Sequence, residues 1–473
     1  MYERLTRGCE GKIMSKNNSS FGINNVLKII SKDGACVHFC GVGGVGMSAL
    51  FRLSEHFGIR VSGTDRARGE YFDALARDGA CVYCNAQEAR SLSGAVDLVV
   101  YSLALDERDS ELIEAEARGI PMVSRAEYLG ALATCYGRSV SVSGSHGKST
   151  VTAMLSHILE CSGKNPTVLS GAALSVGGTN SRIGALDYLV FESCEYKDSF
   201  LIPMPDIGIF LNLELDHVDW FASLEDISRS FLCAMNRAGC AIVNFDDREL
   251  AKNAEKLYTP TISFGKNTGA DYRIITQDET AYALRFSLEY KGASLGSVEL
   301  PVIGAFNIYN ATAAIVAAME CGVSFDECRT ALSTFYGIGR RLERIGEIEG
   351  RPVYYDYAHH PTEIAEGIKA VKGDTGGPVT VIFGPHTYSR TKGLWRGFVN
   401  SLCMAEHVIL TEISAIREQM IEGVSSARLA DECGAGVARN SDDLRDMLSK
   451  SSGAVIIMGA TDMEWVKKVV LDG

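Results

Sequence analysis

Short apolar runs, each followed by a stretch with helical spacing, recur along most of the chain. Ala35–Cys40 predicts a buried strand, which a glycine-rich turn connects to a helix expected over Met47–Phe57. Arg60–Gly63 and Val96–Tyr101 predict further strands of the same unit. Because strands that alternate with helices form parallel sheets covered on both faces, we expect an α/β domain over residues 35–136.

A second α/β unit is expected over residues 137–338. Its apolar runs predict strands at Ser139–Ser143, Tyr188–Phe191 and Ile207–Leu211. Between Ala270 and Leu300, apolar and polar residues alternate around turn signals, which predicts an antiparallel appendage to the sheet. The Ala-rich segment Ala305–Met319 then has the composition of a helix.

Strand-like runs also recur in the last part of the chain, over residues 339–473. The expected strands are Val353–Asp356, Val379–Phe383, Val408–Thr411 and Val455–Met458. Helix-like stretches separate them, so we expect a third α/β unit built of βαβ repeats. The polar residues 1–34 are expected to form a tail with a short helix at Val26–Ile30, and we place no function there.

The length of the chain fits this three-domain division, and its net charge excludes some classes of function. At roughly 150 residues per domain, 473 residues correspond to about three domains. The formal net charge of −13 argues against a protein that coats nucleic acid or an anionic membrane. No apolar stretch reaches the roughly 18–20 residues of a membrane span, and we expect no secretory signal at the basic N-terminus.

The cysteines bear on the cellular compartment. All 14 are scattered along the chain, many in apparent core segments, without the spacing of a disulfide framework. Cys81 and Cys84 form a CxxC without a partner pair, which does not by itself specify a zinc site. We therefore expect reduced thiols in a cytoplasmic enzyme.

A segment between the strand Ser139–Ser143 and the helical run Val151–Cys161 has the pattern of a phosphate-binding loop. It consists of Gly144, Ser145, His146, Gly147, Lys148, Ser149 and Thr150. Glycines let backbone N–H groups point at phosphate oxygens, and the following helix N-terminus favours negative charge. Lys148 is expected to reach the β- and γ-phosphates, and Ser149 to offer a hydroxyl to magnesium. An ordinary glycine-rich βα turn is the alternative.

Acidic residues follow two later strands of the same unit. Tyr188–Phe191 ends at Glu192, and His217 lies among acidic residues after Ile207–Leu211. The carboxyl ends of neighbouring parallel strands are a common place for metal ligands, so Glu192 and His217 are candidates. A solvated turn explains either residue alone, and the phosphate loop in the same domain is what favours a metal site.

A second glycine-rich loop follows the first strand of the chain. Gly41, Gly43, Gly44 and Gly46 lie in a GxGxxG pattern, and Asp65 ends the next strand at the offset of a ribose-binding acid. This pattern suits a diphosphate. It leaves open whether the diphosphate belongs to NAD or to a nucleotide sugar.

Cations and histidines gather near the predicted strands of the third unit. They include Arg341, His359, His386 and Arg390. Such residues at strand ends facing a cleft suit anionic substrates, and a surface charge cluster is the alternative.

Taken together, seven segments resemble the Mur ligase family. In order along the chain they are GVGGVGMSAL, GSHGKST, FESCEYKDSFL, NLELDHVDWF, GRRLE, DYAHHPTEI and PHTYSRTK. The resemblance runs from about residue 35 to about residue 460. It implies a Rossmann-like domain that binds a UDP-sugar, a central P-loop ATPase domain, and a Rossmann-like C-terminal domain that completes the ATP and amino-acid sites.

The resemblance also implies roles for individual residues. Those implied to face the UDP-sugar are Gly41, Gly43, Gly44, Gly46, Asp65 and Arg125. Those implied to bind ATP are Gly144, Ser145, His146, Gly147, Lys148, Ser149, Thr150, Asn307, Asn310, Arg341 and Asp356. Those implied to hold a metal are Ser149, Glu192 and His217. Those implied in catalysis are Lys148, Glu192, His217, Arg341, His359, His386 and Arg390.

These roles imply an enzyme that uses ATP and Mg²⁺ to join L-alanine to the lactyl carboxylate of UDP-N-acetylmuramate in peptidoglycan precursor synthesis. The reaction would pass through an acyl phosphate and release ADP and phosphate. Neither nucleic acid nor membrane is an expected partner, and a monomer or weak homodimer is expected. Three alternatives stay open: a family member that recycles the murein tripeptide, an inactive Mur-type nucleotide-binding protein, and an NAD-dependent oxidoreductase. The last leaves Lys148 and the metal candidates unexplained.

Three places depart from the family's pattern, and one of them is the C-terminal segment Gly459-Ala460-Thr461-Asp462, which breaks the usual glycine there. Phe306 stands where many members carry a histidine before the first adenine-contacting asparagine, so stacking near the adenine is expected to differ. Ser149 stands in place of a common threonine and keeps the hydroxyl. Since the lysine, metal and ribose positions are all present, we expect an active enzyme.

Overall fold

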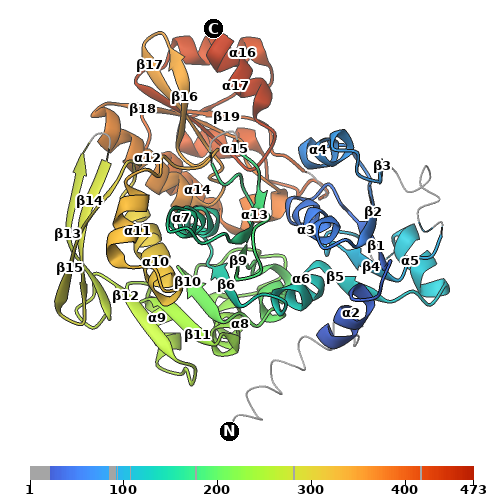
Figure 1. Ribbon diagram of the computed structural model, residues 1–473. Helices are drawn as coiled ribbons and strands as arrows, with labels where there is room; N and C mark the ends of the chain where they lie inside the picture. Colours follow the sequence, from blue (N-terminus) through green and yellow to red (C-terminus); the bar gives the residue numbers. More distant parts are fainter. Residues whose placement is uncertain are drawn as a thin grey trace.

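The predicted alternation of strands and helices is present as three sheets that follow one another along the chain (Figure 1). The computed structural model describes residues 22–84, 92, 94–106, 108–175, 178–280, 283–415 and 418–472. Within these residues the sheets contain five, ten and six strands. The expected fold class, α/β with largely parallel sheets, is confirmed. No helix in this part of the chain is long and apolar enough to cross a membrane.

The first sheet is parallel throughout, with the strand order β3-β2-β1-β4-β5. Its strands are β1 (Cys36–Cys40), β2 (Arg60–Asp65), β3 (Val82–Cys84), β4 (Leu98–Tyr101) and β5 (Met122–Ser124). Its helices are α2 (Ile23–Ile30), α3 (Val45–His56), α4 (Glu70–Arg77), α5 (Ser110–Ala117) and α6 (Arg125–Ala133). The chain leaves β1 toward β2 on one side and later returns to β4 on the other. The glycine loop after β1 therefore lies at a topological switch point, where open α/β sheets bind ligands.

The central sheet has the order β15-β14-β13-β12-β11-β10-β6-β9-β7-β8. Its strands are β6 (Arg138–Ser143), β7 (Thr167–Leu169), β8 (Ser181–Arg182), β9 (Tyr188–Glu192), β10 (Ile207–Phe210), β11 (Cys240–Asn244), β12 (Thr261–Gly265), β13 (Tyr272–Thr280), β14 (Ala283–Tyr290) and β15 (Ala293–Leu300). The accompanying helices are α7 (Lys148–Cys161), the 3₁₀ helix η1 (Tyr196–Leu201), α8 (Leu224–Arg237), α9 (Arg248–Ala254), α10 (Phe306–Glu320) and α11 (Phe325–Leu332). The antiparallel ladder β13–β15 is the appendage that the alternating pattern predicted.

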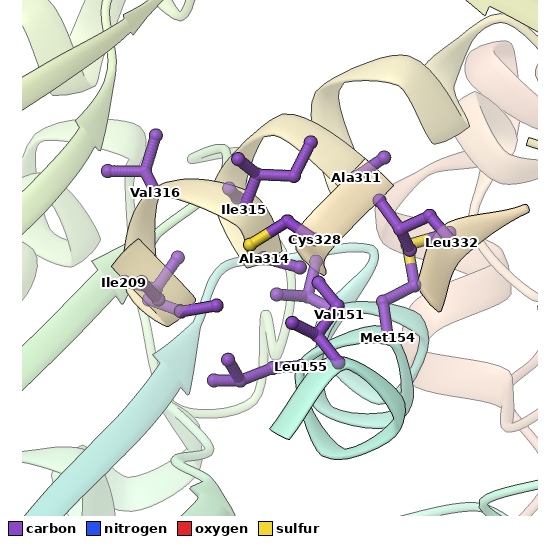
Figure 2. Close-up of a cluster of buried hydrophobic side chains, with 14 of the residues drawn as sticks. Val151, Met154, Leu155, Ile209, Ala311, Ala314, Ile315, Val316, Cys328 and Leu332 are labelled. Atoms are coloured by element: carbon purple, nitrogen blue, oxygen red, sulfur yellow. The ribbon is translucent and has the colours of Figure 1, made fainter. Parts of the chain in front are cut away.

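The largest apolar core lies between this sheet and the helices α7, α10 and α11. Figure 2 shows Val151, Met154 and Leu155 of α7 on the side of α10 that carries Ala311 and Ala314, with Ile209 of β10 at the left of the view. Small alanine side chains let α7 and α10 approach closely, and the buried branched residues fill the remaining space. This packing fixes α7, and with it the phosphate loop, on the sheet.

Helix α7 begins three residues earlier than the apolar pattern predicts, at Lys148 rather than Val151. The cause is Gly147, which serves as its N-cap in a left-handed conformation that the hydrophobic spacing does not reveal.

The third sheet has the order β16-β17-β21-β18-β19-β20. Its strands are β16 (Glu343–Ile348), β17 (Arg351–Asp356), β18 (Val379–Phe383), β19 (His407–Leu410), β20 (Gly436–Val437) and β21 (Ala454–Met458). Its helices are α12 (Pro361–Thr375), α13 (Tyr388–Gly393), α14 (Trp395–Leu402), α15 (Ser426–Cys433), α16 (Ser441–Ser449) and α17 (Glu464–Asp472). The last strand, β21, pairs in parallel with both β17 and β18 and so lies inside the sheet rather than at its edge.

Candidate active site

The phosphate loop connects β6 to α7, and Gly147 determines its shape. Gly147 has a φ of 84°, and a Cβ on it would lie 2.6 Å from Asn310 Oδ1. The His146 backbone N–H donates to Asn212 Oδ1 at 2.7 Å, which holds the loop against the residues after β10. The buried Ser149 lies in the first turn of α7. The predicted loop thus lies at a helix N-terminus, where backbone N–H groups and the helix dipole favour phosphate.

Substituting Gly147 with alanine should weaken nucleotide binding about tenfold or more. The left-handed conformation costs a residue with a Cβ about 1–2 kcal/mol, and the added methyl must also displace Asn310. The measurement is ATP affinity by calorimetry, together with the thermal unfolding midpoint. Gly163→Ala is the matched control, since Gly163 has a φ of 71° and an added Cβ would meet nothing within 4 Å. Equal ATP affinities in the two variants would contradict the prediction.

Lys148 is held by the loop and by a buried carboxylate. Its Nζ donates to Gly144 O at 2.5 Å and to Glu195 Oε2 at 3.2 Å. Burial disfavours the charged ammonium, but Glu195 and its acidic neighbours outweigh burial and raise the pKa of Lys148. Lys148 is therefore a positive charge, already in place at the loop, for an anionic ligand.

Glu195 is a residue of this cluster that the sequence analysis did not single out. Its side chain is only 1% exposed, and its Oε1 lies 3.6 Å from His217 Nε2. The available signal was a second carboxylate three residues after Glu192. The sequence could not show that Lys148 and His217, which come from other segments, converge on that second carboxylate rather than on the first.

Glu192 ends β9 and has contacts of its own. Its Oε1 accepts hydrogen bonds from Ser170 Oγ at 2.8 Å and from the Gly171 backbone N–H at 2.5 Å. The expected metal residues are thus distributed around the loop: Ser149 in α7, Glu192 at the end of β9, and His217 beside Glu195. The carboxylates of Glu192 and Glu195 and the hydroxyl of Ser149 suit a magnesium ion, which prefers oxygen ligands.

A cavity of about 830 Å³ opens between the central sheet and the C-terminal unit. Its lining includes the predicted nucleotide residues His146, Gly147, Thr150, Asn307, Asn310, Arg341 and Asp356. The two asparagines are linked, since Asn310 Nδ2 donates to Asn307 Oδ1 at 2.9 Å. Phe306, which departs from the family's pattern, also lines the cavity, so an aromatic ring is available there.

Asp356 lies at the end of β17, on the C-terminal side of this cavity. Burial raises its pKa to about 7, although the nearby Arg341 guanidinium opposes the shift. Near neutral pH this carboxyl can donate as well as accept a hydrogen bond, which suits a sugar hydroxyl.

Arg390 joins the central and C-terminal units through a buried ion pair. Its Nε donates to Asp216 Oδ1 at 3.0 Å and its Nη2 to Asp216 Oδ2 at 3.2 Å. The remaining guanidinium nitrogen of Arg390, Nη1, lies 3.0 Å from His386 Nδ1. Arg390, which the family resemblance implies in catalysis, thus also holds the two units together.

Two histidines near Arg390, His359 and His386, are neutral at physiological pH. Burial lowers the pKa of His359 to about 4, and burial together with Arg390 lowers the pKa of His386 to about 4. Their rings lie 6.3 Å apart, centroid to centroid. Positive charge here therefore comes from Arg390, while the histidines offer hydrogen bonds.

A second cluster joins the phosphate loop to the C-terminal unit. His146 Nδ1 lies 3.2 Å from Glu363 Oε1 in the first turn of α12, and His146 Nε2 lies 3.5 Å from Glu214 Oε2. Glu363 also approaches Arg341, at 3.6 Å, and the His360 ring packs against that of His146 in a tilted arrangement, with centroids 4.7 Å apart. Burial alone would favour neutral His146, but Glu363 and Glu214 raise its pKa to about 9.

The contact between His146 and Glu363 should weaken as pH rises. Because its folded pKa of about 9 exceeds the ordinary value of about 6.5, this stabilisation is full below pH 6.5 and is lost as pH rises through 9. We expect a loss on the order of 1–3 kcal/mol, with a larger radius of gyration at pH 9.5 than at pH 6.5. Small-angle scattering and thermal unfolding across this range test it. His146→Gln should flatten the dependence, whereas His56→Gln, at an exposed site on α3, should retain it.

The glycine loop after β1 is closed by Asp65. The Gly43 backbone N–H donates to Asp65 Oδ2 at 2.8 Å, and a Cβ on Gly43 would lie 2.9 Å from that oxygen. The loop also contacts the central unit, since Asn180 Nδ2 donates to Val45 O at 2.8 Å. Asp65 therefore shapes the loop itself, in addition to any contact with a ribose.

Arg125, the first residue of α6, faces the same loop. A Cβ on Gly46 would lie 3.0 Å from Arg125 Nη1. Burial lowers the pKa of Arg125, and Cys194 and Glu192 of the central unit act on it in the opposite direction. Arg125 thus lies between the glycine loop and the acidic residues near the phosphate loop, which suits an anion that extends from one to the other.

Comparison with known proteins matches all three units to one family. Residues 36–136 match the model described as Mur ligase family, catalytic domain. Residues 142–318 match the Mur ligase middle domain, and residues 340–461 the Mur ligase, glutamate ligase domain. The chain is 36% identical over 448 residues to the UDP-N-acetylmuramate–L-alanine ligase of Lachnospira eligens, covering 90% of this chain and 96% of that protein.

The chain belongs to the Mur ligase family. The enzyme of the same name from Clostridium novyi is also 36% identical to this Mur ligase, over 92% of this chain and 97% of that protein. Its fold is similar to the crystal structure of UDP-N-acetylmuramate–alanine ligase from Thermotoga maritima, with a TM-score of 0.77, 23% identity and coverage of 92% and 98%. It is also similar to a murein peptide ligase from Psychrobacter arcticus, with a TM-score of 0.68, 23% identity and coverage of 93% and 98%. The resemblance expected from the seven segments is confirmed, and the oxidoreductase alternative is wrong.

Proposed function

We propose that this chain is an ATP-dependent ligase that joins L-alanine to the lactyl carboxylate of UDP-N-acetylmuramate. One observation carries the proposal: the phosphate loop, through Gly147, and the pair Arg341 and Asp356 of the next unit line one cavity of about 830 Å³. The relatives that bear the name of this activity match along nearly their whole length, which supports the same substrates here.

The chemistry begins with activation of the carboxylate, which by itself is a poor acceptor for an amine. The phosphate loop and Lys148 hold the β- and γ-phosphates, which leaves the γ-phosphorus open to in-line attack by a lactyl oxygen. This attack forms an acyl phosphate and expels ADP. The amine of L-alanine then attacks the acyl carbon, loses a proton, and expels phosphate as the amide forms.

The residues around the loop also fit the magnesium ion that such a transfer uses. Ser149, Glu192 and His217 would hold it, and the ion would neutralise charge between the γ-phosphate and the carboxylate. Side chains of the protein itself bind and orient the substrates. Arg125 orients the anionic sugar nucleotide, while Arg341 approaches the phosphates from the C-terminal unit. The neutral His359 and His386 orient the amino acid without adding charge.

Two measurements test the function. The first offers ATP and UDP-N-acetylmuramate with either L-alanine or free murein tripeptide. Faster ligation of L-alanine supports the proposal, and faster ligation of the tripeptide would assign the chain to the recycling ligase. The second labels the lactyl carboxylate with heavy oxygen, and one label should appear in the released phosphate. Label in AMP, or none in phosphate, would contradict the acyl phosphate.

A further inference from the structure

Beside Lys148 lies a group of three side chains with different donor atoms. The thiol of Cys194, a carboxylate oxygen of Glu195 and an imidazole nitrogen of His217 all lie within 4.8 Å of one another. Glu195 is buried, while Cys194 and His217 are partly exposed. An ion arriving from solvent can therefore reach a site whose deepest ligand, Glu195, is already desolvated.

The backbone around these ligands is fixed. His217 has a φ of 50°, and its N–H donates to Asp216 Oδ1 at 2.7 Å. The Tyr196 ring packs 4.8 Å from the His217 ring, centroid to centroid. Asp216 is in turn held by Arg390. Supporting contacts of this kind orient a histidine before any ion binds.

We propose that Cys194, Glu195 and His217 form a binding site for a thiophilic divalent cation of the zinc type. Sulfur, nitrogen and oxygen donors together suit Zn²⁺, whereas Mg²⁺ prefers oxygen alone. Tetrahedral bonds of about 2.0–2.3 Å place ligand atoms roughly 3.5 Å apart. His217 Nε2 and Glu195 Oε1 already lie 3.6 Å apart, and one ligand atom from each of the three residues lies within 4.8 Å of the other two. Three protein ligands leave a fourth position for water.

Another three-residue group in the described residues lacks these properties. His38, Cys40 and Glu111 are also close together, but all three are buried. Both His38 nitrogens and both Glu111 oxygens already have partners, namely Ser62 and Thr64 besides each other. An ion there would have to break a satisfied network without access to solvent, which distinguishes this group from the one that contains Cys194.

Occupation of the site would oppose nucleotide binding. Glu195 cannot ligate a cation and keep its full contact with the Lys148 ammonium, and the cation would repel that ammonium. The ion should therefore inhibit ligation rather than support it. This consequence depends on the proposed function, whereas binding of the ion does not.

The binding test uses the full chain after dialysis against a chelator. One equivalent of Co²⁺, a spectroscopic substitute for Zn²⁺, should give a thiolate-to-metal absorption band in the near ultraviolet, and one equivalent of Zn²⁺ should remove it. Cys194→Ser should abolish the band and weaken Zn²⁺ binding at least about 100-fold. The control is Cys81→Ser, at an exposed thiol elsewhere, which should retain the band.

Two further measurements test the cation site without relying on the absorption band. Zn²⁺ should protect Cys194 of the unmodified chain from alkylation, as mapped by mass spectrometry, which needs no substitution. If the chain ligates L-alanine with Mg²⁺, equimolar Zn²⁺ should inhibit it, and Cys194→Ser should resist at least tenfold more Zn²⁺. No band in the unsubstituted chain, a band that survives Cys194→Ser, or unprotected Cys194 would overturn the site. Failure of ligation alone would count against the proposed function only.

Discussion

Replacing Lys148 with alanine should lower the rate of ligation by about 10²–10³. The ammonium is held at the loop by Gly144 O and Glu195, so it meets the charge that builds up between the β- and γ-phosphates without having to move into place. Such a fixed donor acts mainly on the transition state, and the loss should therefore appear in kcat rather than in KM for ATP. The measurement is phosphate release at saturating substrates.

The same substitution should also reduce stability, because it leaves Glu195 buried without its cation. Losing one member of a buried pair costs about 3–5 kcal/mol. Adding Glu195→Gln should recover most of the unfolding midpoint without recovering activity, which separates the two effects. Lys252→Ala, at an exposed lysine on α9, is the control and should change neither. Retention of more than about a tenth of the activity in Lys148→Ala would show that the loop lysine is not catalytic.

Asp216→Asn should separate the central and C-terminal units. The pair of Asp216 with Arg390 is 7% and 11% exposed, and breaking such a pair costs about 3–5 kcal/mol because the remaining charge stays buried. Although burial opposes ionisation, Arg390 holds the pKa of Asp216 well below its ordinary value of about 3.8. This stabilisation is therefore present at every pH above 4 and is lost only as pH falls through the lower folded value.

Scattering and unfolding data would show the effect of Asp216→Asn as a larger radius of gyration and a lower unfolding midpoint at pH 7. The matched control is Glu406→Gln, which breaks the exposed pair with Lys372 and should alter the free energy of unfolding by less than about 1 kcal/mol. If Asp216→Asn keeps the radius and midpoint of the unsubstituted chain, the pair does not hold the units together.

The fold was largely predictable because its signals are local. Apolar runs mark the buried strands, and Val379–Phe383 occupies the same residues in the sequence pattern and in the structure. The phosphate loop was equally accessible, since glycines, a lysine and a hydroxyl lie within seven consecutive residues. The ends of helices and strands were harder to predict from the sequence. The start of α7 depends on the backbone conformation of Gly147, which hydrophobic spacing does not encode.

The parts of the site that the sequence analysis did not identify depend on contacts between distant segments. The sequence did not single out Glu195 because its partners, Lys148 and His217, come from other segments of the chain. His146 was expected to serve only the phosphate loop, yet its carboxylate partner Glu363 comes from a helix more than two hundred residues later. Charges that pair across units leave no periodic trace in the sequence, so only the tertiary structure reveals them.

The position of β21 has a consequence for how the chain folds during synthesis. This strand is made last of its sheet, yet it lies between β17 and β18, with Val455 paired to Val353 and Ile456 to Val381. The ribosome must therefore release the chain as far as Met458 before the third sheet can close, and strand pairs of such high contact order form late. Until then β17 and β18 expose unpaired edges. A premature stop just before Ala454 would remove the inner strand of this sheet and leave the nascent chain prone to aggregation or proteolysis.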